Sequence, residues 1–151
     1  MRIVVAGGGL IGARHIAHVA DHPKFDLVGV IDPDPKVRAA APVASFDSIE
    51  AVDVQVDGII IATPTDLHAA NAEAAAARGW HMLIEKPVAG TLGQAGRVGA
   101  AVAWGGVSAL CRLYTSYGAD EEARVSRRGS GVNKTKNKEQ DETGEQRRAR
   151  G

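Results

Sequence analysis

The sequence predicts an α/β fold built on a doubly wound parallel sheet, and two observations support this prediction. Short apolar runs alternate with helical patterns from residue 1 to about residue 97, as expected of parallel strands joined by right-handed crossovers. The first apolar run leads directly into a glycine turn and a helix start, and an acidic residue follows the second run. That order is typical of a Rossmann-type sheet with a nucleotide crevice at the carboxyl ends of its strands.

The first two expected strands flank the first helix. Arg2–Ala6 is an apolar run that ends at glycines, as a buried parallel strand does beside a ligand crevice. A helix is expected from Leu10 to about Asp21, because small side chains recur there at helical spacing. Phe25–Ile31 is a second apolar run and follows as the second strand.

The next region is predicted to hold only short elements. The run Asp32–Pro35 is a turn that can begin a short helix through Ala40, since proline is tolerated in the first turn of a helix. Ser45–Phe46 is expected as a very short third strand, and a brief helix is expected from about Ser48.

The second half of the sheet follows the same alternation. Residues 57–62 form a continuous apolar run of the kind that a buried parallel strand carries. A stretch rich in alanine predicts a helix over Asp66–Arg78, which Gly79 ends. His81–Ile84 is the expected fifth strand, and a further helix is expected from Thr91 to about Val98.

Length and composition limit the function classes. With 151 residues the chain has room for one ordinary domain. Its 18 basic and 18 acidic residues cancel, so no net field favours nucleic acid or an anionic membrane. The single cysteine, Cys111, excludes an internal disulfide, and no apolar run approaches the roughly 20 residues that span a bilayer. We therefore expect a cytoplasmic chain with no nucleic-acid or membrane partner.

The carboxyl-terminal part departs from the alternating pattern. Apolar residues over 99–117 have no clear period, and residues 107–114 could at best form one strand. Residues 119–151 contain few large apolar side chains, whereas ordering a backbone costs roughly 1–2 kcal/mol per residue. We expect a nucleotide-binding domain over 1–118 and a disordered tail over 119–151. Acidic neighbours cancel the charge of Lys134, Lys136 and Lys138 in this tail, which argues against a contact with nucleic acid.

The glycine turn predicts a cofactor site. Gly7 permits the tight turn out of the first strand, Gly9 lets a pyrophosphate approach the backbone, and Gly12 lets the helix pack close to the sheet. The helix that starts at Leu10 and Ile11 directs unpaired N–H groups and the positive end of its dipole at the phosphates. These features together predict dinucleotide binding.

An acidic residue stands at the distance that dinucleotide sites require. Asp32 lies 20 residues beyond Gly12, directly after the second strand, where its carboxylate would accept hydrogen bonds from the adenosine ribose hydroxyls. The same carboxylate would repel a 2′-phosphate. No arginine or serine immediately follows it, although Arg38 lies further along. NAD is therefore the expected cofactor, with NADP possible.

Two further segments are expected at the same edge of the sheet. Thr63 and Pro64 follow the fourth strand, with His68 shortly after, and Glu85–Pro87 follow the fifth strand. Because ligands bind at the carboxyl ends of parallel strands, both segments would face the crevice of the glycine turn. Lys86 could then hydrogen-bond a nicotinamide ribose or a substrate hydroxyl, or take part in acid–base chemistry. If this segment did not follow a strand of a nucleotide-binding sheet, Glu85 and Lys86 would be interpreted as charged residues exposed to water at the end of a strand.

With these segments in this order, the sequence resembles the Gfo/Idh/MocA oxidoreductases, the family of glucose–fructose oxidoreductase and inositol dehydrogenase. The resemblance extends to about residue 97 of 151. The matching stretches are Gly7–Gly12 with His15, Asp32–Asp34, Ala62–Pro64 with His68, and Glu85–Pro87.

The resemblance implies NAD(P)-dependent oxidation of a sugar, cyclitol or related alcohol by hydride transfer to nicotinamide. Lys86 matches the family lysine that assists substrate binding and proton transfer, and is the implied catalytic residue. The loop with Thr63, Pro64 and His68 matches the loop that borders the nicotinamide ribose. The implied cofactor-binding set is Gly7, Gly9, Leu10, Ile11, Gly12, Asp32, Thr63, Pro64, His68, Glu85 and Lys86.

The chain departs from its family near Val98. The family normally continues into an α+β domain that carries the substrate site, and we expect that domain to be absent here. The codons of Cys111–Asp120, read one base later, allow Val-Gly-Phe-x-Arg-Arg-x-x-Pro, which is similar to the opening of that domain. We hypothesise that the tail from about residue 98–105 is a frameshift product, which resequencing the gene tests. Such a truncated chain would bind nucleotide but be catalytically impaired.

Other interpretations stay open. The chain could be a non-enzymatic dinucleotide-binding or interaction module, or a methyltransferase that binds S-adenosylmethionine, although Glu85–Pro87 argues against the latter. His15, His18 and His22 fall on one side of the first helix, where solvated histidines are a simpler explanation than a metal site. Cys111 has no partner histidine that would make it a nucleophile. The oligomeric state is not predicted.

Overall fold

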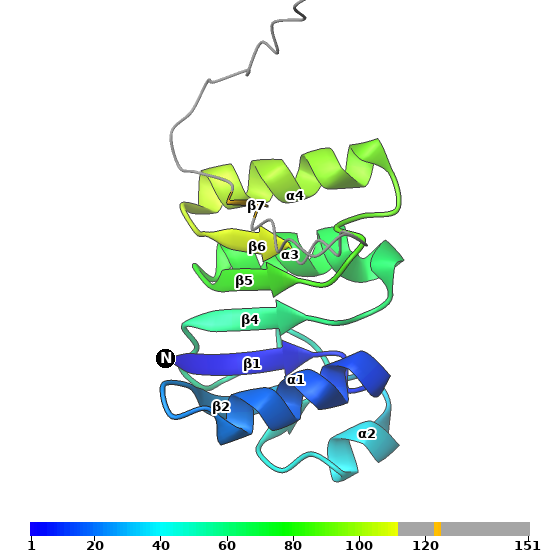
Figure 1. Ribbon diagram of the computed structural model, residues 1–151. Coiled ribbons are helices and arrows are strands. Elements are labelled where there is room, and N and C mark those ends of the chain that lie inside the picture. Colours follow the sequence, from blue (N-terminus) through cyan, green and yellow to red (C-terminus); the bar gives the residue numbers. More distant parts are fainter. Residues whose placement is uncertain (112–122, 125–151) are drawn as a thin grey trace, which may run out of the picture.

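The structure is a computed structural model that describes residues 1–111 and 123–124 (Figure 1). The expected domain boundary at residue 118 lies outside the described residues. So does the expected tail from residue 119, apart from Ala123 and Arg124. Within the described part of the chain, no helix has both the length and the apolar character needed to cross a membrane.

The described strands form one sheet in the order β3-β2-β1-β4-β5-β6-β7. All pairs from β3 through β6 are parallel, and β7 joins β6 in the antiparallel direction. The chain order reverses between β1 and β4, which is the switch point where ligands bind in such sheets. The predicted Rossmann-type fold is confirmed. The strands are β1 (Arg2–Ala6), β2 (Asp26–Ile31), β3 (Ser45–Phe46), β4 (Gly58–Ile61), β5 (His81–Ile84), β6 (Ala109–Cys111) and β7 (Ala123–Arg124).

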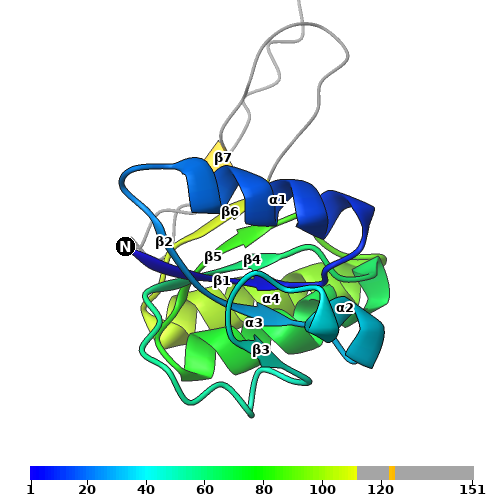
Figure 2. The same ribbon diagram turned by 90° about the horizontal axis from the view of Figure 1, so that it is seen from below.

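Helices cover both faces of the sheet (Figure 2). Helix α1 (Leu10–Asp21) lies on one face, and α3 (His68–Ala77) and α4 (Leu92–Gly105) lie together on the other. The short helix α2 (Pro35–Ala39) follows β2, and a 3-10 turn, η1 (Thr65–Leu67), leads into α3. The sheet is therefore enclosed from both sides in the region of β1 and β4.

The two-sided burial explains why the strands read as continuous apolar runs. Successive residues of a strand point to opposite faces, so a strand between two helical layers needs apolar side chains at every position. In β1, Val4 joins the cluster under α3 and α4, whereas Ile3 and Val5 join the cluster under α1. The side chain of Val4 and that of Val5 are both fully buried.

Helix α4 is longer than the predicted helix, which was expected to end near Val98. It begins at the Thr91 cap, whose hydroxyl accepts a hydrogen bond from the Gln94 N–H at 3.2 Å, and it ends at Gly105. Gly106 follows in the left-handed conformation, with φ 62°, as is common after helix ends. Within α4 only Val98 and Val102 are buried, one turn apart. The apolar periodicity of its sequence is therefore too weak to indicate where the helix ends.

The brief helix expected from Ser48 is wrong. The chain forms turns there instead, and the Val52 N–H donates to the Ile49 carbonyl oxygen at 3.2 Å. The Arg78 guanidinium donates to the carbonyl oxygens of Ile49, at 3.1 Å, and of Val52, at 2.5 Å. Because these carbonyls are satisfied by a side chain from the end of α3, the segment needs no helix to satisfy its backbone.

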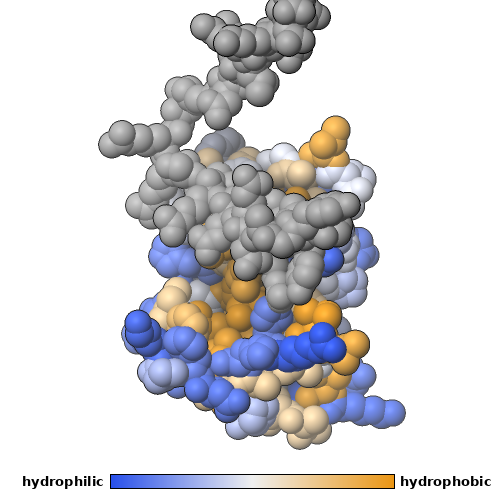
Figure 3. Space-filling view, in the orientation of Figure 1, coloured by the Kyte–Doolittle hydropathy of each residue, from blue (hydrophilic) through white to orange (hydrophobic). Residues whose placement is uncertain are grey.

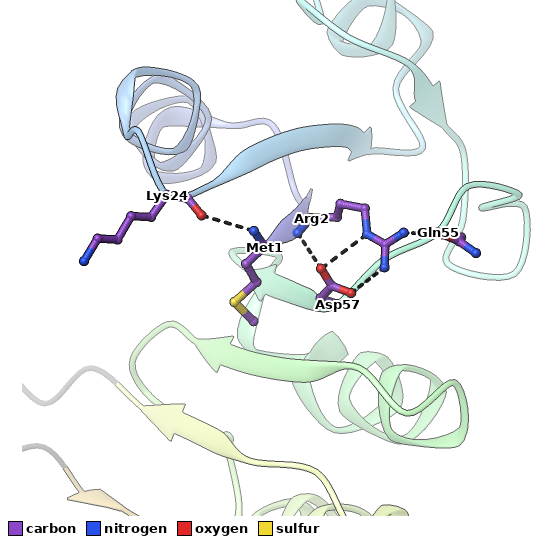
Figure 4. A network of polar contacts seen from close by, with 5 residues as sticks. All are labelled: Met1, Arg2, Lys24, Gln55 and Asp57. Atoms are coloured by element: carbon purple, nitrogen blue, oxygen red, sulfur yellow. Dashed lines mark hydrogen bonds and ion pairs between the residues drawn. The ribbon is translucent and has the colours of Figure 1, made fainter.

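A polar network joins the amino end of β1 to the segment before β4 (Figure 4). Asp57 accepts hydrogen bonds from the backbone N–H of Arg2 and from Nη2 of the same residue, both at 2.7 Å. The guanidinium also donates to the amide oxygen of Gln55. These bonds from Arg2 hold the pKa of Asp57 at about 2. The network lies at the opposite end of the strands from the candidate site.

Candidate functional site

The glycine turn follows β1 and opens directly onto α1. Gly7 has φ +88°, and a Cβ there would lie 2.6 Å from the carbonyl oxygen of Ala62. A Cβ on Gly12 would lie 1.7 Å from the Gly7 carbonyl oxygen. By contrast, nothing lies within 4 Å of the Cβ position of Gly9. The turn is therefore closed toward the protein at its two ends and open at its middle.

The start of α1 is accessible to a ligand. Gly9 precedes the helix and provides no side-chain cap, so the N–H groups of the first turn are not bound by a capping side chain. Leu10 is 76% exposed and Ile11 is 42% exposed. Figure 3 shows hydrophilic and hydrophobic side chains intermingled on the α1 side of the molecule. The N–H groups of the first turn of α1 and the dipole of this helix suit an anionic group.

Asp32 lies at the end of β2, half-buried beside the glycine turn. Its Oδ2 accepts a hydrogen bond from the Gly8 N–H at 2.8 Å, and its Oδ1 accepts one from the Asp34 N–H at 2.8 Å. Each carboxylate oxygen has a further lone pair that can accept a bond from a ligand hydroxyl. The bond to Gly8 was not predicted from the sequence.

Arg38 lies close to Asp32 on α2. Its Nη1 donates to the carbonyl oxygens of Asp32 and Pro33, both at 2.8 Å. The guanidinium thus lies against the backbone of the turn that follows β2. Arg38 lies six positions beyond Asp32, and the sequence alone does not indicate these bonds.

The loop after β4 is ordered by two side chains of α3. The Asn71 amide donates to Oγ1 of Thr63 at 2.9 Å. His68, only 1% exposed, has Nε2 at 2.9 Å from the Thr63 carbonyl oxygen and Nδ1 at 3.0 Å from the Pro87 carbonyl oxygen. Pro64 itself is exposed. His68 therefore joins the loop after β4 to the segment after β5.

The segment after β5 carries Glu85, Lys86 and Pro87. The backbone N–H of Glu85 donates to the Ile61 carbonyl oxygen at 3.0 Å, which continues the sheet pairing. Its Oε1 lies 2.6 Å from Nε2 of His15 on α1, and each of these side chains is 13% exposed. Lys86 is exposed, and its peptide bond to Pro87 is cis.

His18 on α1, His22 directly after α1, and the cysteine take no part in these contacts. His18 and His22 are exposed, and in residues 1–111 no group of three or more histidine, cysteine or acidic residues is arranged to hold a metal ion. Partial burial, with a smaller contribution from the charge of Glu85, raises the pKa of the Cys111 thiol. Such a thiol is a poor nucleophile.

The carboxyl ends of β1, β2, β4 and β5 thus present the glycine turn, an acid and two loops at one edge of the sheet. Sequence reasoning named most of these residues, but it missed the contact between His15 and Glu85, the role of Asn71 and the contacts of Arg38. These three depend on where α1, α2 and α3 lie in space.

Most of the described part of the chain matches a known protein family. Residues 1–110 match the family model GFO_IDH_MocA, described as "Oxidoreductase family, NAD-binding Rossmann fold". This match continues through α4 and into β6, beyond Val98, near which the sequence was expected to depart from the family. The expected oxidoreductase family and NAD-binding fold are therefore confirmed.

Curated relatives of known activity match the same region. UDP-N-acetylglucosamine 3-dehydrogenase of Acidithiobacillus ferrooxidans is 40% identical over 92 residues, which cover 58% of this chain and 28% of the relative. Inositol 2-dehydrogenase of Rhizobium meliloti is 34% identical over 94 residues, which cover 58% of this chain and 28% of the relative. The chain thus spans less than a third of the length of these relatives.

Solved structures of the family have the same fold. The WlbA dehydrogenase of Bordetella pertussis, solved in complex with NADH and UDP-GlcNAcA, is 29% identical with a TM-score of 0.69. The superposition covers 73% of this chain and 36% of the other chain.

Proposed function

This chain belongs to the Gfo/Idh/MocA oxidoreductase family, and we propose that it forms the NAD-binding half of a dehydrogenase for a sugar-like or cyclitol alcohol. The observation that carries the proposal is the open glycine turn at the uncapped start of α1, with the Asp32 carboxylate beside it. The two relatives act on a nucleotide sugar and on inositol, as their names state.

The amino end of α1 would hold the pyrophosphate of NAD. The unbonded N–H groups near Gly9, Leu10 and Ile11 are donors, and the helix dipole favours a negative group there. A side chain at Gly7 or Gly12 would collide with backbone, so these glycines keep the turn in its tight form. The donor set therefore fits a pyrophosphate.

Asp32 would bind the adenosine ribose and set the preference for NAD. Its carboxylate is already oriented by the N–H groups of Gly8 and Asp34, and it retains acceptor capacity for ribose hydroxyls. A 2′-phosphate at the same place would meet a like charge. NAD should therefore bind more tightly than NADP, which remains a weaker ligand.

Lys86 is the residue we propose to act on the substrate. When bound, NAD supplies the acceptor for a hydride from the alcohol carbon. The Nζ of Lys86 would hydrogen-bond the alcohol oxygen and assist loss of its proton, as the family resemblance implies. Thr63 and Pro64 would border the nicotinamide ribose, while His68 and Glu85 would support the loops that carry these groups.

The 151-residue chain assayed alone should bind NAD but oxidise little alcohol. The region matched to curated relatives covers 28% of their length, and it supplies the cofactor side of the site. Correct orientation of reactants lowers a barrier by roughly 7–11 kcal/mol, and the matched region supplies only part of the groups that orient them.

Calorimetric titration of the purified chain with NADH, NADPH and S-adenosylmethionine tests the proposal. We expect saturable binding of NADH, weaker binding of NADPH and no binding of S-adenosylmethionine. Binding of S-adenosylmethionine without NADH would replace the dehydrogenase assignment with a methyltransferase. A non-enzymatic dinucleotide module would bind NADH and gain no turnover when supplied with the substrate domain of a relative.

A further inference from the structure

Two histidines from different helices hold the residues on either side of Lys86. His15, on α1, has Nε2 at 2.6 Å from Oε1 of Glu85. His68, on α3, has Nδ1 at 3.0 Å from the carbonyl oxygen of Pro87. The segment Glu85–Pro87 is therefore fixed at its first residue from one face of the sheet and at its last residue from the other face (Figure 2).

The contact between His15 and Glu85 is well sheltered from water. Each side chain is 13% exposed, and hydrogen bonds to charged groups are stronger where water is scarce. Glu85 uses its second oxygen, Oε2, to accept a bond from the Lys86 N–H at 3.3 Å. The carboxylate thus connects α1 to the backbone of Lys86 itself.

His68 closes the other side of the segment. Its ring is 1% exposed and lies between two backbone carbonyl oxygens, those of Thr63 and Pro87. Carbonyl oxygens only accept hydrogen bonds, so the ring must donate to them. A neutral imidazole donates to one of the two, and an imidazolium donates to both. The ring thus lies between the loop after β4 and the residue after Lys86, with one nitrogen within 3.0 Å of each carbonyl oxygen.

We propose that His15 and His68 are positioning residues that fix the Glu85–Pro87 segment and so orient Lys86 toward the nicotinamide half of the cofactor. The inference rests on the proposed function. The two halves of the cofactor then depend on separate parts of the protein. The glycine turn and Asp32 hold the adenosine and pyrophosphate, whereas the two histidines act on the nicotinamide side through Lys86.

This separation gives a direct binding test. NAD and ADP are titrated against the wild-type chain, His15→Leu and His68→Leu. Both variants should bind NAD about tenfold more weakly, while their ADP affinity should stay within about twofold. His15→Gln, which keeps a donor near the position of Nε2, should recover part of the NAD affinity. His18→Leu is the matched control, because His18 is exposed on the same helix.

A second readout needs no ligand. Hydrogen–deuterium exchange at the Lys86 N–H should become several-fold faster in His15→Leu than in wild-type or His18→Leu, because the Glu85 carboxylate that accepts this N–H loses its partner. This readout also covers the case in which His68→Leu, a change at a buried side chain, prevents folding.

Either of two results would overturn the inference. One is an equal loss of NAD and ADP affinity in folded His15→Leu, which would indicate general damage to the site. The other is exchange at Lys86 that is unchanged in the same variant. If the wild-type chain bound neither NAD nor ADP, the proposed function would fail, while the exchange measurement would still decide whether the histidines order the segment.

Discussion

The Asp32 carboxylate accepts a hydrogen bond from the Gly8 N–H at 2.8 Å. The acid at the end of β2 therefore orders the glycine turn after β1, in addition to any contact it makes with a ribose. A single residue links the two parts of the motif that are 24 positions apart in the sequence. Changes at Asp32 should thus affect both the shape of the turn and the choice of cofactor.

Asp32→Ala should weaken NAD binding by about tenfold or more, because it removes an acceptor for the ribose and a support of the turn. The preference for NAD over NADP should also fall, since the carboxylate that repels a 2′-phosphate is gone. Calorimetric titration with both cofactors measures this. Asp53→Ala, at an exposed acid, is the control and should bind as the wild-type chain does. Unchanged affinity of Asp32→Ala for both cofactors would show that the acid is misassigned.

Gly12→Ala should destabilise the fold by about 2–4 kcal/mol and abolish NAD binding. Its Cβ would lie 1.7 Å from the Gly7 carbonyl oxygen, so backbone must move. Gly99→Ala, in α4 with nothing within 4 Å of its Cβ position, should instead stabilise by about 0.5–1 kcal/mol. Denaturant unfolding followed by circular dichroism measures both. Equal effects of the two substitutions would contradict the close approach of α1 to the turn.

Arg78→Lys should destabilise the chain by about 1–2 kcal/mol, because a lysine cannot reproduce the forked donation to the carbonyls of Ile49 and Val52. The same substitution at Arg97, whose partner Glu73 is exposed, should leave the unfolding midpoint nearly unchanged. The comparison of the two variants by urea unfolding tests whether Arg78 holds the loop after β3. A loss of stability confined to Arg97→Lys would refute this.

Asp57 should contribute to stability in a defined pH range. Hydrogen bonds from Arg2 lower its pKa to about 2, below the ordinary value of 3.8 for this side chain. A lowered pKa in the folded state means that the contribution is fully present above the unfolded pKa and is lost as pH falls through the folded one. The difference in unfolding free energy between wild-type and Asp57→Asn should therefore be constant near neutral pH and shrink between pH 3.8 and about 2. A difference that does not change over this range would contradict the assignment.

The strands and the glycine motif could be predicted from the sequence because their causes are local. A strand buried on both faces must be apolar at every position, and a tight turn into a helix requires glycine where a Cβ would meet backbone. The predicted bounds Arg2–Ala6 and His81–Ile84 agree with β1 and β5.

The rest could not be predicted because it depends on packing. Helix α4 continues beyond Val98 to Gly105, but only Val98 and Val102 are buried in the cluster that it shares with α3, so its sequence gives no clear period. The contact between His15 and Glu85 joins positions 70 apart, and it depends on the packing of α1 against β1 and β2, which brings His15 within reach of the residue after β5. The sequence indicated both residues but not their partnership.

A nuclear magnetic resonance titration that follows the backbone amides as NAD is added tests the proposed dinucleotide site directly. Chemical-shift changes should concentrate at Gly8, Gly9, Leu10, Ile11, Asp32, Thr63 and Lys86, which lie at the carboxyl ends of β1, β2, β4 and β5. Saturable changes at these amides would confirm one dinucleotide site at this edge of the sheet. Changes centred elsewhere, or a folded chain whose amides at these positions do not respond, would contradict it.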